Sequence, residues 1–199
     1  MANILCVYYS RTGRTEKLMQ EIASEFDCEI VKLEDGVKRS GLSGWLVSGL
    51  HAMSRKVPPV KEIETKLPLK NYDLVILGTP VWAGRCSAPM RSFLQQHGDQ
   101  LKKVAYLITR ASDVRYEEVF EQMDLYVQRP HKKALTIRPD TVGSSFWKKD
   151  FLAAAFFVSN QIAHSIGIKF INTRFNLALY QIKKIVLTTR YCRNLSKLL

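Results

Sequence analysis

Five short, mostly apolar segments alternate along the chain with stretches in which apolar residues recur every three or four positions. The apolar segments cover residues 4–9, 28–33, 72–77, 104–109 and 133–137. Segments of this length, bounded by turn residues, are typical of β-strands, and the continuous apolar ones are typical of strands buried on both faces. The stretches between them are typical of helices that pack one side on a sheet. Strands that alternate with helices predict an α/β fold with a parallel sheet.

One of the helical stretches, residues 41–53, carries its large apolar side chains in a single stripe. The stripe consists of Leu42, Trp45, Leu46, Leu50 and Met53. We interpret it as a face that packs on the core, because a stripe of this kind is usually buried. Gly44 and Gly49 weaken the predicted helix, since glycine in a helix interior is unfavourable.

The loop after the first predicted strand contains three hydroxyls, one glycine and two arginines: Ser10, Arg11, Thr12, Gly13, Arg14 and Thr15. It precedes a helix, and a helix N-terminus attracts anions through its free N–H groups and its dipole. The hydroxyls add donors, and Gly13 allows close approach of the backbone. We therefore interpret the loop as a phosphate site, although it matches neither a Walker loop nor G-x-G-x-x-G. The alternative is an ordinary turn capped by Thr12.

The loop predicted after the third strand, residues 78–84, holds Trp82 between Pro80 and Gly84. Right-handed crossovers place the strand-to-helix loops of a parallel sheet at one edge, where ligands bind. At that edge Trp82 could stack on a planar ring, and a ring beside a phosphate site indicates a mononucleotide. The alternative is that Trp82 packs under the neighbouring helix.

Two loops together resemble those of a known family. Residues 10–15 resemble the phosphate loop of the flavodoxin family, T/S-x-T-G-x-T, and residues 78–84 resemble its flavin-ring loop. The order of strands and helices agrees from residue 2 to about residue 162. The resemblance implies a flavodoxin-like, doubly wound sheet of five parallel strands, with FMN as the cofactor. It assigns FMN binding to Ser10, Arg11, Thr12, Gly13, Arg14, Thr15, Pro80, Val81, Trp82, Ala83, Gly84, Thr109, Arg110, Ala111 and Ser112. It names no catalytic residue, and the sequence offers no metal-binding pattern.

Residues 109–112 depart from the family pattern, which is often rich in glycine there. Bulkier side chains could narrow the flavin pocket, and Arg110 could place a cation near the ring if it points inward. A cation at that position would stabilise a reduced, anionic flavin. An Arg110 side chain turned to solvent is an equally good alternative.

The formal net charge of the whole chain is +12, and most of this positive excess lies in its C-terminal part. Residues 1–140 contain 21 Lys and Arg against 17 Asp and Glu, whereas residues 141–199 contain 9 against 1. We predict a flavodoxin-like domain over residues 1–165 and a basic helical extension over residues 166–199. Such an extension could lie on an anionic membrane, bind an acidic protein, dock on the domain or form a frayed tail. We expect no nucleic-acid partner, because no nucleic-acid-binding module is recognisable.

The cysteines are scattered and form no C-x-x-C pair: Cys6, Cys28, Cys86 and Cys192. This spacing favours neither a zinc site nor dithiol chemistry. Asn3, Arg11 and Arg14 interrupt the apolar run that a secretory signal needs. We therefore expect reduced cysteines and a cytoplasmic location, with membrane association through the basic extension left open.

These observations predict an FMN-binding oxidoreductase or electron-transfer protein. Electron-shuttling flavodoxins are typically acidic, so the basic charge favours a reductase that acts on a quinone or another small acceptor. NAD(P)H is a candidate electron donor, and Arg85 beside Gly84 could meet its phosphate or remain a solvated charge at the rim. The alternative is a non-redox module that keeps the scaffold and uses its basic C-terminus to contact an acidic partner or a membrane surface.

Overall fold

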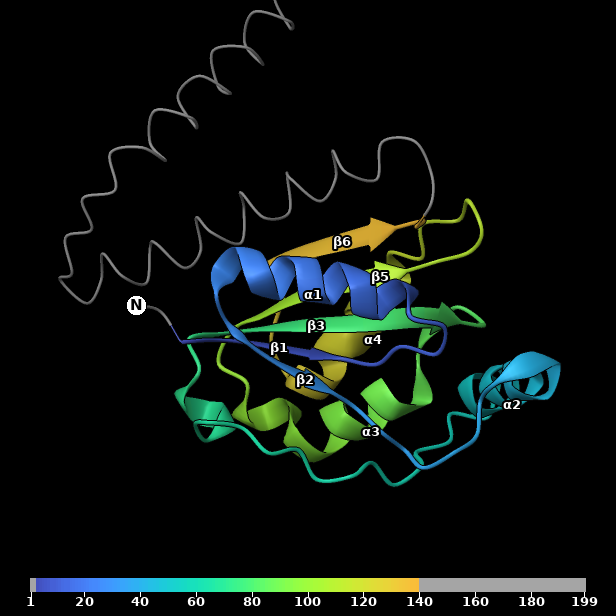
Figure 1. The fold of residues 1–199 in the computed structure, drawn as a ribbon, viewed down its shortest axis with the longest axis horizontal. Helices are drawn as coiled ribbons and strands as arrows, with labels where there is room; N and C mark the ends of the chain where they lie inside the picture. The colour runs from blue at the N-terminus through green and yellow to red at the C-terminus, as the bar shows by residue number, and fades with distance from the viewer. Residues whose placement is uncertain (1–2, 140–199) are drawn as a thin grey trace, which may run out of the picture. The chain divides into compact units, whose positions relative to one another are not determined.

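A parallel sheet of five strands runs through residues 3–139, the part of the chain that the computed structural model describes (Figure 1). The strand order is β2-β1-β3-β5-β6. The strands are β1 (Ile4–Tyr8), β2 (Glu29–Lys32), β3 (Leu74–Trp82), β5 (Val104–Thr109) and β6 (Lys133–Ile137), with the two-residue β4 (Arg85–Cys86) antiparallel to β3. The predicted doubly wound sheet of five parallel strands is confirmed. Because the order reverses between β1 and β3, the carboxyl ends of these two strands flank the crevice where ligands bind in such sheets.

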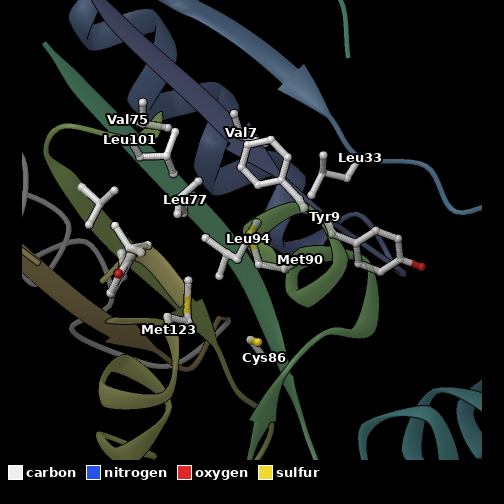
Figure 2. Close-up of a cluster of buried hydrophobic side chains, with 14 of the residues drawn as sticks. Val7, Tyr9, Leu33, Val75, Leu77, Cys86, Met90, Leu94, Leu101 and Met123 are labelled. Atoms are coloured by element: carbon white, nitrogen blue, oxygen red, sulfur yellow. The ribbon is translucent and has the colours of Figure 1, made fainter. Parts of the chain in front are cut away.

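Helices cover both faces of the sheet. The helices are α1 (Arg14–Phe26), α2 (Gly41–Met53), α3 (Ala88–His97) and α4 (Glu118–Val127), with short 3₁₀ helices at Leu69–Asn71 and Gly98–Gln100. On one face, Met19 and Ile22 of α1 pack with Cys6 and Ile76 of the strands. On the other face, apolar side chains of α3 and α4 form a second cluster with the alternate strand residues (Figure 2). Burial on both faces explains why the central strands read as continuous apolar runs.

The third strand is longer than the sequence predicts. Residues 78–84 are predicted as a loop, but β3 continues through Trp82. The carbonyl oxygen of Gly78 accepts a hydrogen bond from the backbone N–H of Tyr9 at 2.9 Å. Because β1 ends at Tyr8, the residues of β3 that follow Gly78 have no neighbour in β1. Backbone groups two residues apart in a strand point to the same side, so Pro80 faces the side without a ladder partner. Its missing N–H therefore costs no hydrogen bond, and the strand tolerates the proline.

Helix α2 forms where predicted, but its orientation contradicts the interpretation of its apolar stripe. The large apolar side chains of the stripe are exposed, and the buried side consists of Gly44, Ser48 and Ala52. The helix approaches the chain so closely that a Cβ atom on Gly44 would lie 2.0 Å from the carbonyl carbon of Arg39. Only a face of small residues fits at this separation, so the large side chains are directed outward.

A buried arginine fastens the C-terminal end of α2 to the domain. Arg91 of α3 donates to the carbonyl oxygens of His51 at 3.3 Å and Lys56 at 3.1 Å. Its second terminal nitrogen donates to the carbonyl of Cys86 at 3.3 Å. The guanidinium thus holds α2 against α3 and β4, near the carboxyl end of the sheet (Figure 1).

The helix expected from Ser145, the domain boundary at residue 165 and the basic extension over residues 166–199 lie outside the described residues and stay predictions. None of the helices between residues 3 and 139 combines the length and apolar character that crossing a membrane requires.

Candidate functional site

The first loop leads from β1 directly into the N-terminus of α1. Gly13 occupies the cap position with φ of 82°, a left-handed conformation that glycine adopts at little cost. No side chain in the described part of the chain caps this helix. The alternative of a turn capped by Thr12 is therefore wrong. The first-turn N–H groups, which have no partner inside a helix, remain directed to the space in front of the loop.

Ser10 carries an unsatisfied polar atom in this loop. Its residue is buried, and its Oγ has no hydrogen-bond partner among the described residues. Buried hydroxyls are nearly always paired, because an unpaired one loses its hydration without compensation. A ligand oxygen at the helix N-terminus would supply the missing partner, so the donor set fits a phosphate group.

Thr15 and Thr109 join the first loop to the end of β5. Both side chains are buried, and their hydroxyl oxygens are 2.8 Å apart. A hydroxyl donates one hydrogen and accepts others. If Thr109 donates to Thr15, the hydrogen of Thr15 is free to be donated to an anion in the loop. The other loop residues are Arg11, which is half-buried, and Thr12 and Arg14, which are exposed.

The second segment is a hairpin tip rather than a loop. Trp82 pairs with Arg85, and Ala83 and Gly84 between them have φ of 47° and 70°. Two consecutive residues with positive φ define the tight turn that suits a two-residue hairpin. Gln122 of α4 donates to the carbonyl of Gly84 at 3.3 Å. The tip is thus held in a fixed direction, with Pro80 and Val81 half-buried behind it.

Trp82 is half-buried between two side chains that the sequence does not point to. The guanidinium of Arg39 lies over the indole, 5.1 Å from the ring centre. Tyr9 meets the indole edge-on, with ring centres 5.5 Å apart at 85°. The Tyr9 hydroxyl points away from the apolar cluster (Figure 2), and burial raises its pKa to about 12. Trp82 is therefore fixed by neighbours from the loop after β1 and from the β2–α2 connection.

Arg39 is a buried cation with a defined set of partners. Its Nε donates to the Asp35 carboxylate at 3.1 Å, and the same carboxylate pairs with Nη2. Nη2 also donates to Nδ1 of His51 at 3.2 Å, because arginine can only donate. Burial, with the cations of Arg39 and Lys56, lowers the pKa of His51. Nη1 of Arg39 has no partner among the described residues.

The third segment, after β5, is fastened to β6. The backbone N–H of Arg110 donates to the carbonyl of Ile137 at 2.9 Å, and Nε donates to the hydroxyl of Thr136 at 3.1 Å. Nη1 donates to the carbonyl of Ser112. The Arg110 side chain therefore links its own loop to β6 through hydrogen bonds. Ala111 and Ser112 are exposed beside it.

Neither a metal site nor a reactive Cys86 thiol finds support in the residues between 3 and 139. No three His, Cys, Asp or Glu side chains in this range lie close enough together to hold a metal ion. Cys86, in the β4 strand of the hairpin, is buried, and burial raises the pKa of its thiol to about 11. A neutral, inaccessible thiol is a poor nucleophile, so Cys86 acts as a packing residue.

Known proteins share this architecture. A flavoprotein from Lactobacillus acidophilus, solved in complex with FMN, superposes with a TM-score of 0.55 at 21% identity, over 74% of this chain and 99% of that one. A Bacteroides eggerthii protein assigned as a flavoprotein gives a TM-score of 0.63 at 16% identity, over 78% and 99%. At these identities the likeness concerns the fold.

A curated relative matches part of the sequence. The NAD(P)H dehydrogenase (quinone) of Cupriavidus metallidurans is 31% identical over 100 residues, or 49% of this chain. The match covers 48% of that protein, so the chain spans about half the length of this curated relative. No protein-family model matches the chain.

Strand order, helix placement and structural neighbours together define the class: the chain has the flavodoxin-like α/β fold. The fold implied by residues 10–15 and 78–84 is thereby confirmed. The assignment of individual residues to a cofactor stays a prediction.

Proposed function

We propose that this protein binds FMN at the carboxyl edge of its sheet and catalyses electron transfer from NAD(P)H to a quinone or another small acceptor. The observation that carries the proposal is the Ser10 hydroxyl, which is buried without a partner among the described residues, in a loop at a helix N-terminus. A phosphate group satisfies this hydroxyl and the first-turn N–H groups together. The loop lies at the switch point of the sheet, where flavodoxin-like folds place FMN.

The comparisons support the cofactor and the reaction class. The Lactobacillus acidophilus neighbour holds FMN in its structure. The Cupriavidus metallidurans relative carries the name of an NAD(P)H dehydrogenase that acts on quinone. Both properties belong to those proteins, and we extend them to this chain because its own edge residues suit the same ligand.

Each edge segment has a separate task in this proposal. Ser10 and the N-terminus of α1 bind the phosphate, and Thr15 adds a donor that Thr109 orients. The hairpin at Trp82 borders the flavin ring on one side, while Arg39 occupies one face of the indole and fixes its plane. FMN supplies the hydride and electron chemistry, and the protein supplies binding, orientation and electrostatics.

Reduction and reoxidation of the FMN-loaded protein test the proposal. Protein reconstituted with FMN and freed of excess cofactor is mixed with NADH or NADPH under anaerobic conditions, with free FMN at equal concentration as control. We expect one of the two donors to bleach the visible flavin absorption faster than in the control, and a benzoquinone to restore it. If the protein takes up FMN but neither donor reduces it, the proposed oxidoreductase activity is contradicted. Protein that takes up no FMN favours the non-redox module.

A further inference from the structure

Helix α2 exposes a continuous apolar surface, which we call the α2 apolar face: Leu42, Trp45, Leu46, Leu50 and Met53. Their exposed fractions lie between 52% and 77%. Val57, just beyond the helix, is 42% exposed and extends the surface. Single exposed apolar residues are ordinary, but a contiguous group along one helix marks an interaction surface.

The other side of α2 shows that this exposure is built into the fold. Ser48 donates to the carbonyl of Gly44 at 2.7 Å, and both residues are buried against the domain. The space beside Gly44 does not admit even a Cβ atom. Gly44, Ser48 and Ala52 thus form the buried side of the helix, and Trp45 and Leu46 lie on its exposed side.

The charges around α2 favour one kind of partner for the apolar face. Residues 36–61 contain no Asp or Glu. Lys38 precedes the helix, Arg55 and Lys56 follow it, and all three are exposed. A second copy of the chain would bring these cations against each other, whichever way the two helices ran. An apolar helix with a tryptophan and cations at both ends suits the interface of an anionic bilayer.

We propose that the α2 apolar face inserts into the interfacial layer of an anionic phospholipid bilayer. The large side chains would enter the headgroup and upper acyl region, and Lys38, Arg55 and Lys56 would contact lipid phosphates. The contact is peripheral, because an interfacial helix lies in the membrane plane.

Membrane contact at α2 has a consequence for the acceptor. The helix packs against β3 and β4, the hairpin that carries Trp82. A bilayer at α2 therefore lies close to the edge where we place FMN, and a quinone dissolved in lipid would reach it from the membrane. This consequence rests on the proposed function, whereas the membrane contact itself does not.

Vesicle co-sedimentation of the full chain tests the contact without any measurement of activity. Vesicles of phosphatidylcholine alone are compared with an equimolar mixture of phosphatidylcholine and phosphatidylglycerol. We expect binding to the anionic vesicles that weakens as salt is added. Leu46→Glu should reduce the partition coefficient about tenfold or more. The matched control is Leu125→Glu, because Leu125 on α4 is also a leucine on a helix and is 79% exposed. The control should bind like the wild type.

A second readout keeps the test independent of folding defects. Brominated phosphatidylcholine in the anionic vesicles should quench tryptophan fluorescence, and Trp45→Phe, which keeps the apolar face, should remove most of that quenching. Failure of the wild-type chain to bind anionic vesicles overturns the proposal. Equal loss of binding in Leu46→Glu and Leu125→Glu overturns it as well. Undiminished binding by Leu46→Glu would overturn it too, and would assign the lipid contact to another part of the chain, such as the basic residues 166–199.

Discussion

The hydroxyl oxygens of Thr15 and Thr109 are 2.8 Å apart, although the two residues are separated by 94 positions in the chain. The contact ties the first turn of α1 to the last residue of β5. Two of the three candidate segments at the edge of the sheet, residues 10–15 and 109–112, therefore share one buried hydrogen bond. Neither hydroxyl can change partner without leaving the other unpaired in the interior. The bond therefore links the shape of the candidate phosphate site to the stability of the domain.

Replacement of either threonine by valine should destabilise the protein without FMN by about 1–2 kcal/mol, because each variant leaves one buried hydroxyl unpaired. The double variant Thr15→Val and Thr109→Val should cost less than the sum of the two. Denaturant unfolding of the four proteins gives the coupling free energy, which we expect to be about 1 kcal/mol. Strictly additive effects would show that the two hydroxyls do not interact.

Ser10→Ala should separate ligand binding from stability. The Ser10 hydroxyl has no partner among the described residues, so its removal should leave the melting temperature of the protein without FMN nearly unchanged. A hydrogen bond to a charged phosphate oxygen would be lost, and FMN affinity should fall about ten- to a hundredfold. The dissociation constant comes from fluorescence titration. An affinity within about twofold of the wild type would remove Ser10 from the phosphate site.

Two glycines in α2 should respond in opposite ways to the same substitution. Gly44→Ala places a Cβ against the backbone of Arg39 and should destabilise the fold by about 1–3 kcal/mol. A Cβ atom added at Gly49 would meet no neighbouring element within 4 Å, so Gly49→Ala should stabilise the helix by about 0.5–1 kcal/mol. Thermal unfolding of both variants checks the pair. Similar effects from the two would mean that α2 is not seated on its small-residue face.

His51 should make stability depend on pH in the mildly acidic range. The folded state lowers its pKa, so the unfolded chain binds a proton more readily than the folded one. The free energy of unfolding should therefore fall as pH drops below about 6.5, the ordinary histidine value. His51→Gln should flatten this dependence between about pH 7 and pH 5.5. Chemical denaturation across that range measures it, and an equal slope in both proteins would contradict the assignment.

The sequence predicts the sheet well because each strand is indicated by a pattern within its own few residues. Buried strands read as apolar runs, and the crossover rule then places residues 10–15 and 109–112 at one edge without any structure. The end of the third strand is missed because Gly78 and Pro80 look like turn residues. Pro80 is tolerated because β1 has already ended beside it. Where β1 ends relative to β3 depends on how the two strands are aligned, which the sequence does not show.

Side-chain partners from separate elements escape a reading of the sequence. The contact between Arg39 and Trp82 joins the β2–α2 connection to β3, and no local sequence pattern predicts such a pair. The stripe on α2 is a different case, because periodicity shows that a face exists but not which way it points. The small residues Gly44, Ser48 and Ala52 are the signal that could have indicated the buried side.

Flavin binding is best measured by titrating the purified protein, first stripped of any flavin, with FMN and with riboflavin. The two ligands share the ring and differ by the phosphate that we assign to Ser10 and the N-terminus of α1. We expect FMN to bind with quenched fluorescence and riboflavin to bind far more weakly. Equal affinities for the two would contradict the phosphate site, and a protein that binds neither would contradict the flavin function altogether.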